Sequence, residues 1–244
     1  MIPSWLHVLA ILSLAVSVGC AVWIAVDETG RPQHMWIMNV VWPATALFGG
    51  VLALAGYLAY GRGAAKGATT PEPAGHGAPS EASETPFAVK VGKGVTHCGS
   101  GCTLGDIFAE WLAFLVPGVA VAFGWHTIFA DKMFAVWVLD YVVAFLIGIA
   151  FQYFTIAPMR GLLVKDGIVA AVKADALSLT AWQIGMYGFM AIAHFWIFGR
   201  LLGAELAVPT PEFWFMMQIA MLCGFVTAYP VNWWLIRRGI KEAM

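Results

Sequence analysis

Residues 133–155 read MFAVWVLDYVVAFLIGIAFQYFT, and Asp140 is the one charged residue among them. A helix needs about 20 mostly apolar residues to cross a lipid bilayer, so this stretch predicts a transmembrane helix. The composition of the whole chain agrees, because hydrophobic residues make up 61% of its 244 positions and charged residues only 11%. Soluble domains carry about 25% charged residues. We therefore expect an integral membrane protein.

The chain holds six apolar runs of this kind, at residues 5–26, 36–60, 107–130, 133–155, 178–202 and 212–236. They predict an all-α fold, a polytopic membrane protein of about six transmembrane helices surrounded by a lipid bilayer. Ten of the 13 Lys and Arg residues lie on one side of this arrangement, and only Arg31, Lys132 and Arg200 lie on the other. Positively charged loops stay in the cytoplasm. We therefore expect a multi-pass protein of the bacterial cytoplasmic (inner) membrane, with its N-terminus outside and its C-terminus inside.

A polar segment divides these runs. Residues 61–86 are rich in Ala, Gly, Pro, Ser and Glu and hold almost no large apolar side chain. Such a composition cannot bury enough surface to order itself. We expect a two-helix N-terminal membrane piece at 1–60, a flexible cytoplasmic linker at 61–94 and a four-helix membrane core at 95–244. Within the core, residues 159–177 favour an amphipathic helix on the cytoplasmic lipid surface.

Polar side chains inside the predicted helices are candidates for function, because they are costly at membrane depth. Asp140 is the lone carboxylate of its run, and with His126, His194 and Gln218 it is expected in one outer layer. Glu110 is expected in an inner polar group, together with Gln152 and Asn232. The alternative is that the amide side chains only form hydrogen bonds between helices.

Two polar stripes follow helical spacing in the last two runs. The first holds Gln183, Tyr187, Met190 and His194, and the second holds Gln218, Met221, Phe225, Tyr229 and Asn232. Residues spaced three and four apart share one face of a helix. We interpret the stripes as the lining of a pathway that the two helices share.

The motif HCGSGC, residues 97–102, places two cysteines four positions apart. We expect a sharply folding glycine-rich loop, followed by Asp106 as the N-cap of the third helix. Thiolate and imidazole suit Cu(I) or Zn, so His97, Cys98, Cys102 and Asp106 are candidate metal ligands. A redox-active cysteine pair and a purely structural turn remain open alternatives.

A second, weaker metal signal lies in HMWIMN, residues 34–39. His34, Met35 and Met38 combine imidazole with thioether, a set that suits copper. The same methionines would also serve as ordinary packing. We expect this segment in a short outer loop.

Other function classes find little support. We see no basic patch for nucleic acid, and no nucleophile elbow, phosphate loop, zincin helix or nucleotide fingerprint, so a hydrolase or an ATP-driven pump is not indicated.

The chain resembles a family of bacterial integral-membrane proteins known as a domain of unknown function. Four segments carry the resemblance: HCGSGCTLGDIFAEW, FQYFTIAPMRG, ADALSLTAWQIGMYGFM and YPVNWWLIRRGIKEAM. The resemblance spans most of residues 95–244. It implies membership and an important HCGSGC motif, and links some members loosely to copper-oxidase annotations.

The leading hypothesis is handling or transport of a soft metal ion, with copper the best match and zinc the other candidate. The outer His, Met and Asp side chains would admit the ion, and the HCGSGC motif would receive it inside. One alternative is a membrane redox protein, with a cycling cysteine pair or a haem held by His126 and His194. Another is a non-catalytic subunit or scaffold of a membrane complex. A homo-oligomer is compatible with each.

Overall fold

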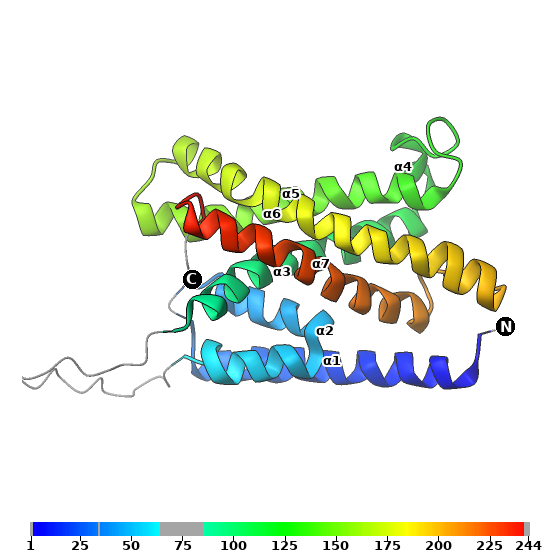
Figure 1. The fold of residues 1–244 in the computed structure, drawn as a ribbon, viewed down its shortest axis with the longest axis horizontal. Coiled ribbons are helices and arrows are strands. Elements are labelled where there is room, and N and C mark those ends of the chain that lie inside the picture. The colour runs from blue at the N-terminus through cyan, green and yellow to red at the C-terminus, as the bar shows by residue number, and fades with distance from the viewer. Residues whose placement is uncertain (1, 34, 64–84, 242–244) are drawn as a thin grey trace, which may run out of the picture.

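A computed structural model of the chain describes residues 2–33, 35–63 and 85–241. The described part is helical and holds no strand, only an isolated bridge between Trp125 and Phe129. Its long helices lie side by side along one axis (Figure 1). They are α1 (Ser4–Gly30), α2 (Met38–Gly56) with the π-helical continuation η1 (Tyr57–Gly61), α3 (Phe87–Leu115), α5 (Lys132–Arg160), α6 (Val164–Ala191) with the π-helical continuation η2 (Ile192–Leu202), and α7 (Pro211–Arg237); the short α4 (Pro117–Ala122) joins α3 to α5.

Five of the described helices are long and apolar enough to cross a membrane, at residues 4–30, 38–61, 132–157, 164–202 and 211–237. Large apolar side chains also lie on the outside of the bundle, for example Trp5, Leu52 and Leu146, each more than half exposed. A water-soluble protein does not present such a surface over its whole length. The prediction of a helical membrane protein is therefore confirmed in outline.

The α2–η1 segment turns back on itself instead of crossing the bundle. Gly50 has φ 48° and ψ −125°, which breaks the helix. As a result Trp42, near the start of α2, packs directly against Gly61 at the end of η1. The side-chain amide of Gln33 also donates to the carbonyl of Gly61 at 2.8 Å. Both ends of the segment therefore lie together. The run predicted at residues 36–60 is helical and apolar enough to span a membrane, but it reverses at Gly50. Glycine permits the reversal because it tolerates positive φ.

The third helix differs most from its prediction. We predicted residues 107–130, but α3 runs from Phe87 to Leu115 and ends just before Pro117. It already includes part of the range predicted as linker. The motif HCGSGC lies in mid-helix and is buried, so the expected loop is absent and Asp106 is no N-cap. The prediction followed hydropathy, and this helix is polar and glycine-rich where it is best packed.

Close packing against α5 explains why this glycine-rich segment stays helical. A Cβ on Gly105 would lie 2.8 Å from Cα of Ala144, and a Cβ on Gly101 would lie 3.4 Å from Cα of Gly148. Small residues at spacing four on both helices let the two backbones approach. Ala144 and Gly148 form this close-packing face on α5, and Gly101 and Gly105 form its partner on α3.

Helix α6 also starts earlier than predicted. Gly161 forms a left-handed turn with φ 60° after α5, and α6 then runs without interruption from Val164 into η2. Residues 164–177 therefore do not form a separate surface helix. Asp175 and Ser178 in this region are fully buried.

The bundle has two ends, named here the Gly161 end and the His126 end. Helix α1 begins at the His126 end, and α7 ends at the Gly161 end (Figure 1). The α1–α2 connection lies at the Gly161 end, because Trp36 contacts Phe154 near the end of α5, with ring centres 5.1 Å apart. Arg31 and Arg62 both contact Asp27, at 3.8 and 2.7 Å. Assigning these two arginines to opposite sides was therefore wrong.

Candidate functional site

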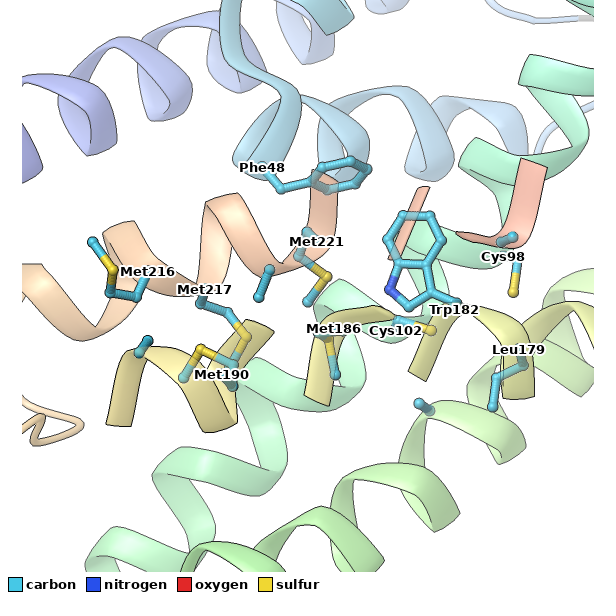
Figure 2. Packing of buried hydrophobic residues seen from close by; sticks show 14 of the residues in the cluster. Phe48, Cys98, Cys102, Leu179, Trp182, Met186, Met190, Met216, Met217 and Met221 are labelled. Carbon is cyan, nitrogen blue, oxygen red and sulfur yellow. The ribbon is translucent and has the colours of Figure 1, made fainter. Parts of the chain in front are cut away.

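Three helices each bring a pair of buried sulfur atoms, one helical turn apart, into the centre of the bundle. The pairs are Cys98 and Cys102 on α3, Met186 and Met190 on α6, and Met217 and Met221 on α7, with Met216 beside the last pair. All seven side chains are at most 5% exposed and belong to one packed cluster. Figure 2 shows their sulfurs in succession through the core, from Met216 to Cys98. We name this set the sulfur row.

Trp182 fixes the cysteine end of the row. Its indole ring occupies the space where a side chain on Gly99 would lie, and its Nε1 is 2.8 Å from where a Cβ on Gly224 would be. The ring of Phe48, at the tip of α2, packs edge-on at 5.6 Å (Figure 2). Two glycines thus make room for one tryptophan, which separates α3 from α7 beside the thiols.

A buried polar group, named here the His97 cluster, adjoins the row at the Gly161 end. It consists of His97, Gln152, Thr155, Asp175, Ser178, Asn232 and Lys241. His97 Nε2 lies 3.0 Å from the hydroxyl of Thr155. Asn232 donates to Ser178 at 2.7 Å. Within the described residues, His97 Nδ1, Asp175 Oδ2 and Asn232 Oδ1 have no hydrogen-bond partner. The cluster therefore has unused donor and acceptor capacity.

The thiols meet this cluster at Asp175. The Cys98 thiol lies close enough to interact with both the Asp175 carboxylate and the Cys102 thiol. The amide of Gln152 donates to Asp175 at 3.5 Å, a long hydrogen bond. The carboxylate rests on Gly148, where any side chain would displace it. Two thiols and one carboxylate are therefore buried near one another between α3, α5 and α6.

A second group of buried carboxylates, the acidic cluster, lies on the other side of the thiols. It consists of Asp106 and Glu110 on α3 and Asp140 on α5, and their charges act on one another. Asp106 and Asp140 are fully buried, and all four of their carboxylate oxygens lack a partner among the described residues. An ionised carboxylate in such a place costs several kcal/mol unless a proton or a cation compensates it. The cluster is therefore suited to hold positive charge.

A cavity of about 600 Å³ extends from Glu110, the one member of the acidic cluster that lines it, to the His126 end. Its lining includes Glu110, Met190, His126, His194, Asp131 and Lys132. His194 Nε2 lies 3.5 Å from Asp131 Oδ2. His126 and His194 thus share one cavity, with Asp140 buried near Glu110. Glu110, predicted in the inner polar group, belongs to this end instead, because α3 starts earlier than expected.

Some of the predicted pathway residues instead tie helices together. Gln218 accepts from Ser13 at 2.7 Å and donates to Ser17 and to the carbonyl of Leu47 at 2.9 and 2.8 Å, so it joins α1 and α2 to α7. The Tyr229 hydroxyl donates to the carbonyl of Ala88 at 3.0 Å.

Other predicted residues divide between the row and its surroundings. Tyr187 donates to the carbonyl of Trp137 at 2.8 Å, whereas the amide of Gln183 has no partner within the described part. Met190 and Met221 belong to the sulfur row.

The predicted copper segment near residue 34 is not part of this arrangement. His34 lies outside the described residues. Met38 is buried in a separate apolar cluster with Trp42, and Met35 packs against that cluster. This segment is at the Gly161 end, opposite His126, so the structure does not bring the two predicted outer sites together.

Sequence reasoning missed several members of the site. Asp175 was assigned to a surface helix, and Lys241 was counted only as a cytoplasmic charge. Met186 and Met217 each lie four positions before a methionine that was noticed, so their spacing was a usable signal. Among the described residues, no three His, Cys, Asp or Glu side chains are grouped so that they could hold a metal ion. A soft-metal site in this chain would need the methionines.

Comparison with known proteins supports the resemblance seen in the sequence. Neither the curated proteins nor the solved structures give a match. Residues 89–241 match a family model, and these residues include α3 to α7, the sulfur row and both polar clusters. The chain therefore belongs to the family of the domain of unknown function DUF4396.

Proposed function

We propose that this protein moves a soft monovalent metal ion, Cu⁺, across the bacterial cytoplasmic membrane along the sulfur row. The observation that carries the proposal is the set of three sulfur pairs, which come from three helices and lie in one buried cluster. Thiolate and thioether ligands select Cu(I) over harder ions. Buried methionines also fill gaps in ordinary cores. Here they continue directly into the two buried thiols.

The two polar clusters supply the charge that the thioethers lack. A Cu⁺ ion among neutral methionines would carry an uncompensated charge in an apolar interior. The acidic cluster lies toward one end of the row, and Asp175 lies beside Cys98 at the other. Carboxylates near both ends lower the cost of admitting and releasing the ion, while sulfur selects it.

The fold supports the predicted orientation, N-terminus outside and C-terminus inside. Six full crossings would place both termini on one side. We propose five, by α1, α3, α5, α6 and α7: the reversal at Gly50 keeps α2–η1 from crossing although it is long and apolar enough, and α3 crosses although it is less apolar than the other four. With Arg31 at the Gly161 end, only Lys132 and Arg200 remain at the His126 end, which strengthens the positive-inside argument.

Cysteines introduced at Pro32 and Gly63 should react with an impermeant thiol reagent from the cytoplasmic side. A cysteine introduced at Glu205 should react from the outer side.

The test is Cu⁺ titration of detergent-purified protein under anaerobic conditions against a chromophoric chelator. We expect wild-type protein to bind Cu⁺ and Cys98→Ser/Cys102→Ser to lose that binding. We expect Met186→Leu/Met190→Leu to slow Cu⁺ uptake into vesicles, since leucine conserves volume but cannot ligate. Met35→Leu/Met38→Leu is the matched control, away from the row, and should behave as wild type.

Two outcomes would contradict the proposal. Equal Cu⁺ binding by wild type and the double-cysteine variant would exclude the thiols as ligands. Uptake that needs the cysteines but not the methionines would exclude the row as a path, and would favour Zn²⁺, which is commonly held by thiolate and imidazole ligands.

A second candidate function, haem-based redox chemistry, is favoured by one observation only. His126 and His194 line the same cavity, which permits ligation from two sides. The visible spectrum of protein purified from haem-replete cells tests it. A Soret band that disappears in His126→Ala and in His194→Ala would support a haem site, whereas a colourless protein would remove this candidate.

A further inference from the structure

Lys241 is buried although it follows the end of α7 and belongs to a turn. Its side chain is 2% exposed. The ammonium group donates to the carbonyl of Gly94 on α3 at 3.0 Å and lies 3.5 Å from the hydroxyl of Ser178 on α6. Burying an ammonium group is costly unless oxygen ligands and a counter-charge compensate it. The surroundings of Lys241 therefore form a cation site that the chain fills with its own side chain.

The counter-charge comes from Asp175. Lys241 acts electrostatically on Asp175 and on His97, the two titratable groups of the His97 cluster. Asn232 Oδ1 lies near Gly94 as well and has no hydrogen-bond partner among the described residues, so it does not bond the ammonium group but is open to another cation at this place. The ammonium group is thus held by a carbonyl oxygen of α3 and lies near a hydroxyl of α6, and the Asp175 carboxylate acts on it through charge without forming a direct ion pair.

Its position gives it a role in the path. Asp175 also lies beside Cys98, the last thiol of the sulfur row at the Gly161 end. A cation that leaves the row on this side meets the same carboxylate that Lys241 neutralises. The lysine and a departing ion therefore compete for one negative charge.

The segment that carries Lys241 is built as a turn that can open. Gly239 has φ 67°, a conformation that suits glycine. The backbone N–H of Lys241 makes a long bond of 3.4 Å to the carbonyl of Leu235. A groove of about 300 Å³ runs beside Gly239 and Ile240, and its lining includes Asp166, Arg160 and Lys173, so a displaced ammonium group would reach a polar, water-accessible surface.

We propose that Lys241 is a built-in occupant of a cation site and that the turn 238–241 is a gate. With the lysine in place, the gate closes the sulfur row at the Gly161 end; when a cation reaches Asp175, the lysine leaves. This inference rests on the proposed function for the identity of the cargo, but not for the existence of the gate.

The gate is tested without any metal, by the reactivity of Cys98 toward a charged, water-soluble methanethiosulfonate in detergent-purified full-length protein. The background is Cys20→Ser/Cys223→Ser, and mass spectrometry identifies the modified residue. We expect Cys98 to react slowly in the background protein and in Lys241→Arg. In Lys241→Met we expect a rate about tenfold higher or more, which corresponds to an opening eased by about 1.4 kcal/mol.

The methionine variant keeps the apolar stem of the side chain, so its folding is protected. A Lys241→Met protein with wild-type thermal stability and unchanged Cys98 reactivity would overturn the proposal. Equal acceleration at Cys223, measured in a Cys20→Ser background that keeps it, would show general loosening and would also overturn it.

A second measurement separates the gate from the cargo. Addition of Cu⁺ to wild-type protein should raise the reaction of Lys241 with a water-soluble amine reagent. If Lys241→Met makes Cys98 more reactive but Cu⁺ does not make Lys241 more reactive, the gate is supported and Cu⁺ as the transported ion is contradicted. If Cu⁺ binds at the cysteines but neither measurement changes, the cargo stands and the gate fails.

Discussion

The α1–α2 piece and the α3–α7 core differ in how their polar side chains are paired. In the first piece, Asp27 receives hydrogen bonds from Arg62 and Tyr57, and Ser13 and Ser17 are bonded to Gln218. In the described part of the core, Asp106, Asp140 and Gln183 have no side-chain hydrogen-bond partner, and one carboxylate oxygen of Asp175 has none. Glu28 is an exception in the first piece, since its carboxylate oxygens also lack partners within the residues that the structure describes.

The difference indicates which part of the molecule carries the function. A satisfied hydrogen bond holds helices together, whereas a buried polar group without a partner lowers stability and persists where it has another role. The family match at residues 89–241 covers the core and leaves out the α1–α2 piece. We therefore interpret α1 and α2 as a support that packs against the core.

The largest loss of stability is expected from a substitution where α3 and α5 pack most closely. Gly105→Val would place a Cβ 2.8 Å from the backbone of Ala144, and two further methyl groups beyond it. Because a backbone atom cannot move aside, α3 and α5 must separate, at a cost of about 3 kcal/mol or more. The measurement is the thermal midpoint in detergent, which we expect to fall sharply.

The control lies on the same helix. A Cβ on Gly92 meets nothing within 4 Å, so Gly92→Val should leave the midpoint almost unchanged. If both variants lose the same stability, close α3–α5 packing is not what keeps this glycine-rich helix in place.

An intermediate change in the free energy of unfolding is expected when one aspartate of each region, Asp140 or Asp27, is replaced by leucine. The two changes should have opposite signs. Asp140→Leu removes a buried carboxylate without partners and should raise the free energy of unfolding, by about 1–4 kcal/mol. It should also reduce Cu⁺ uptake, because the acidic cluster loses a charge. Asp27→Leu removes the partner of Arg62 and should lower stability, by up to about 1 kcal/mol, with uptake retained.

Paired stability and uptake measurements on both variants decide the point. Loss of stability in Asp140→Leu would show that this carboxylate has a structural partner after all. Loss of uptake in a folded Asp27→Leu would mean that the α1–α2 piece takes part in the function itself.

The same contrast shows how far the sequence predicts the structure. Long apolar runs predict α1, α5 and α7 to within a few residues, because hydropathy alone determines which segments are buried in lipid. Hydropathy does not give the bounds of α3, because this helix depends on glycines that fit against Ala144 and Gly148. It also does not show that the methionine pairs of α6 and α7 lie in one cluster with Cys98 and Cys102, since that depends on how the helices pack.

The last prediction concerns the reversal of α2 and tests whether backbone geometry fixes it. Gly50→Ala imposes a side chain at φ 48° and places its Cβ 3.0 Å from the Ser17 hydroxyl. Positive φ costs a non-glycine residue about 1–2 kcal/mol, so the thermal midpoint should fall modestly. Gly19→Ala, in the regular part of α1 with nothing within 4 Å, should be neutral or slightly stabilising. A stabilising Gly50→Ala would mean that α2 runs straight, which would add a sixth crossing and place Arg31 and Arg62 on opposite sides of the membrane. The reversal and the orientation of the chain therefore depend on the same residue, and a two-variant melting experiment tests both.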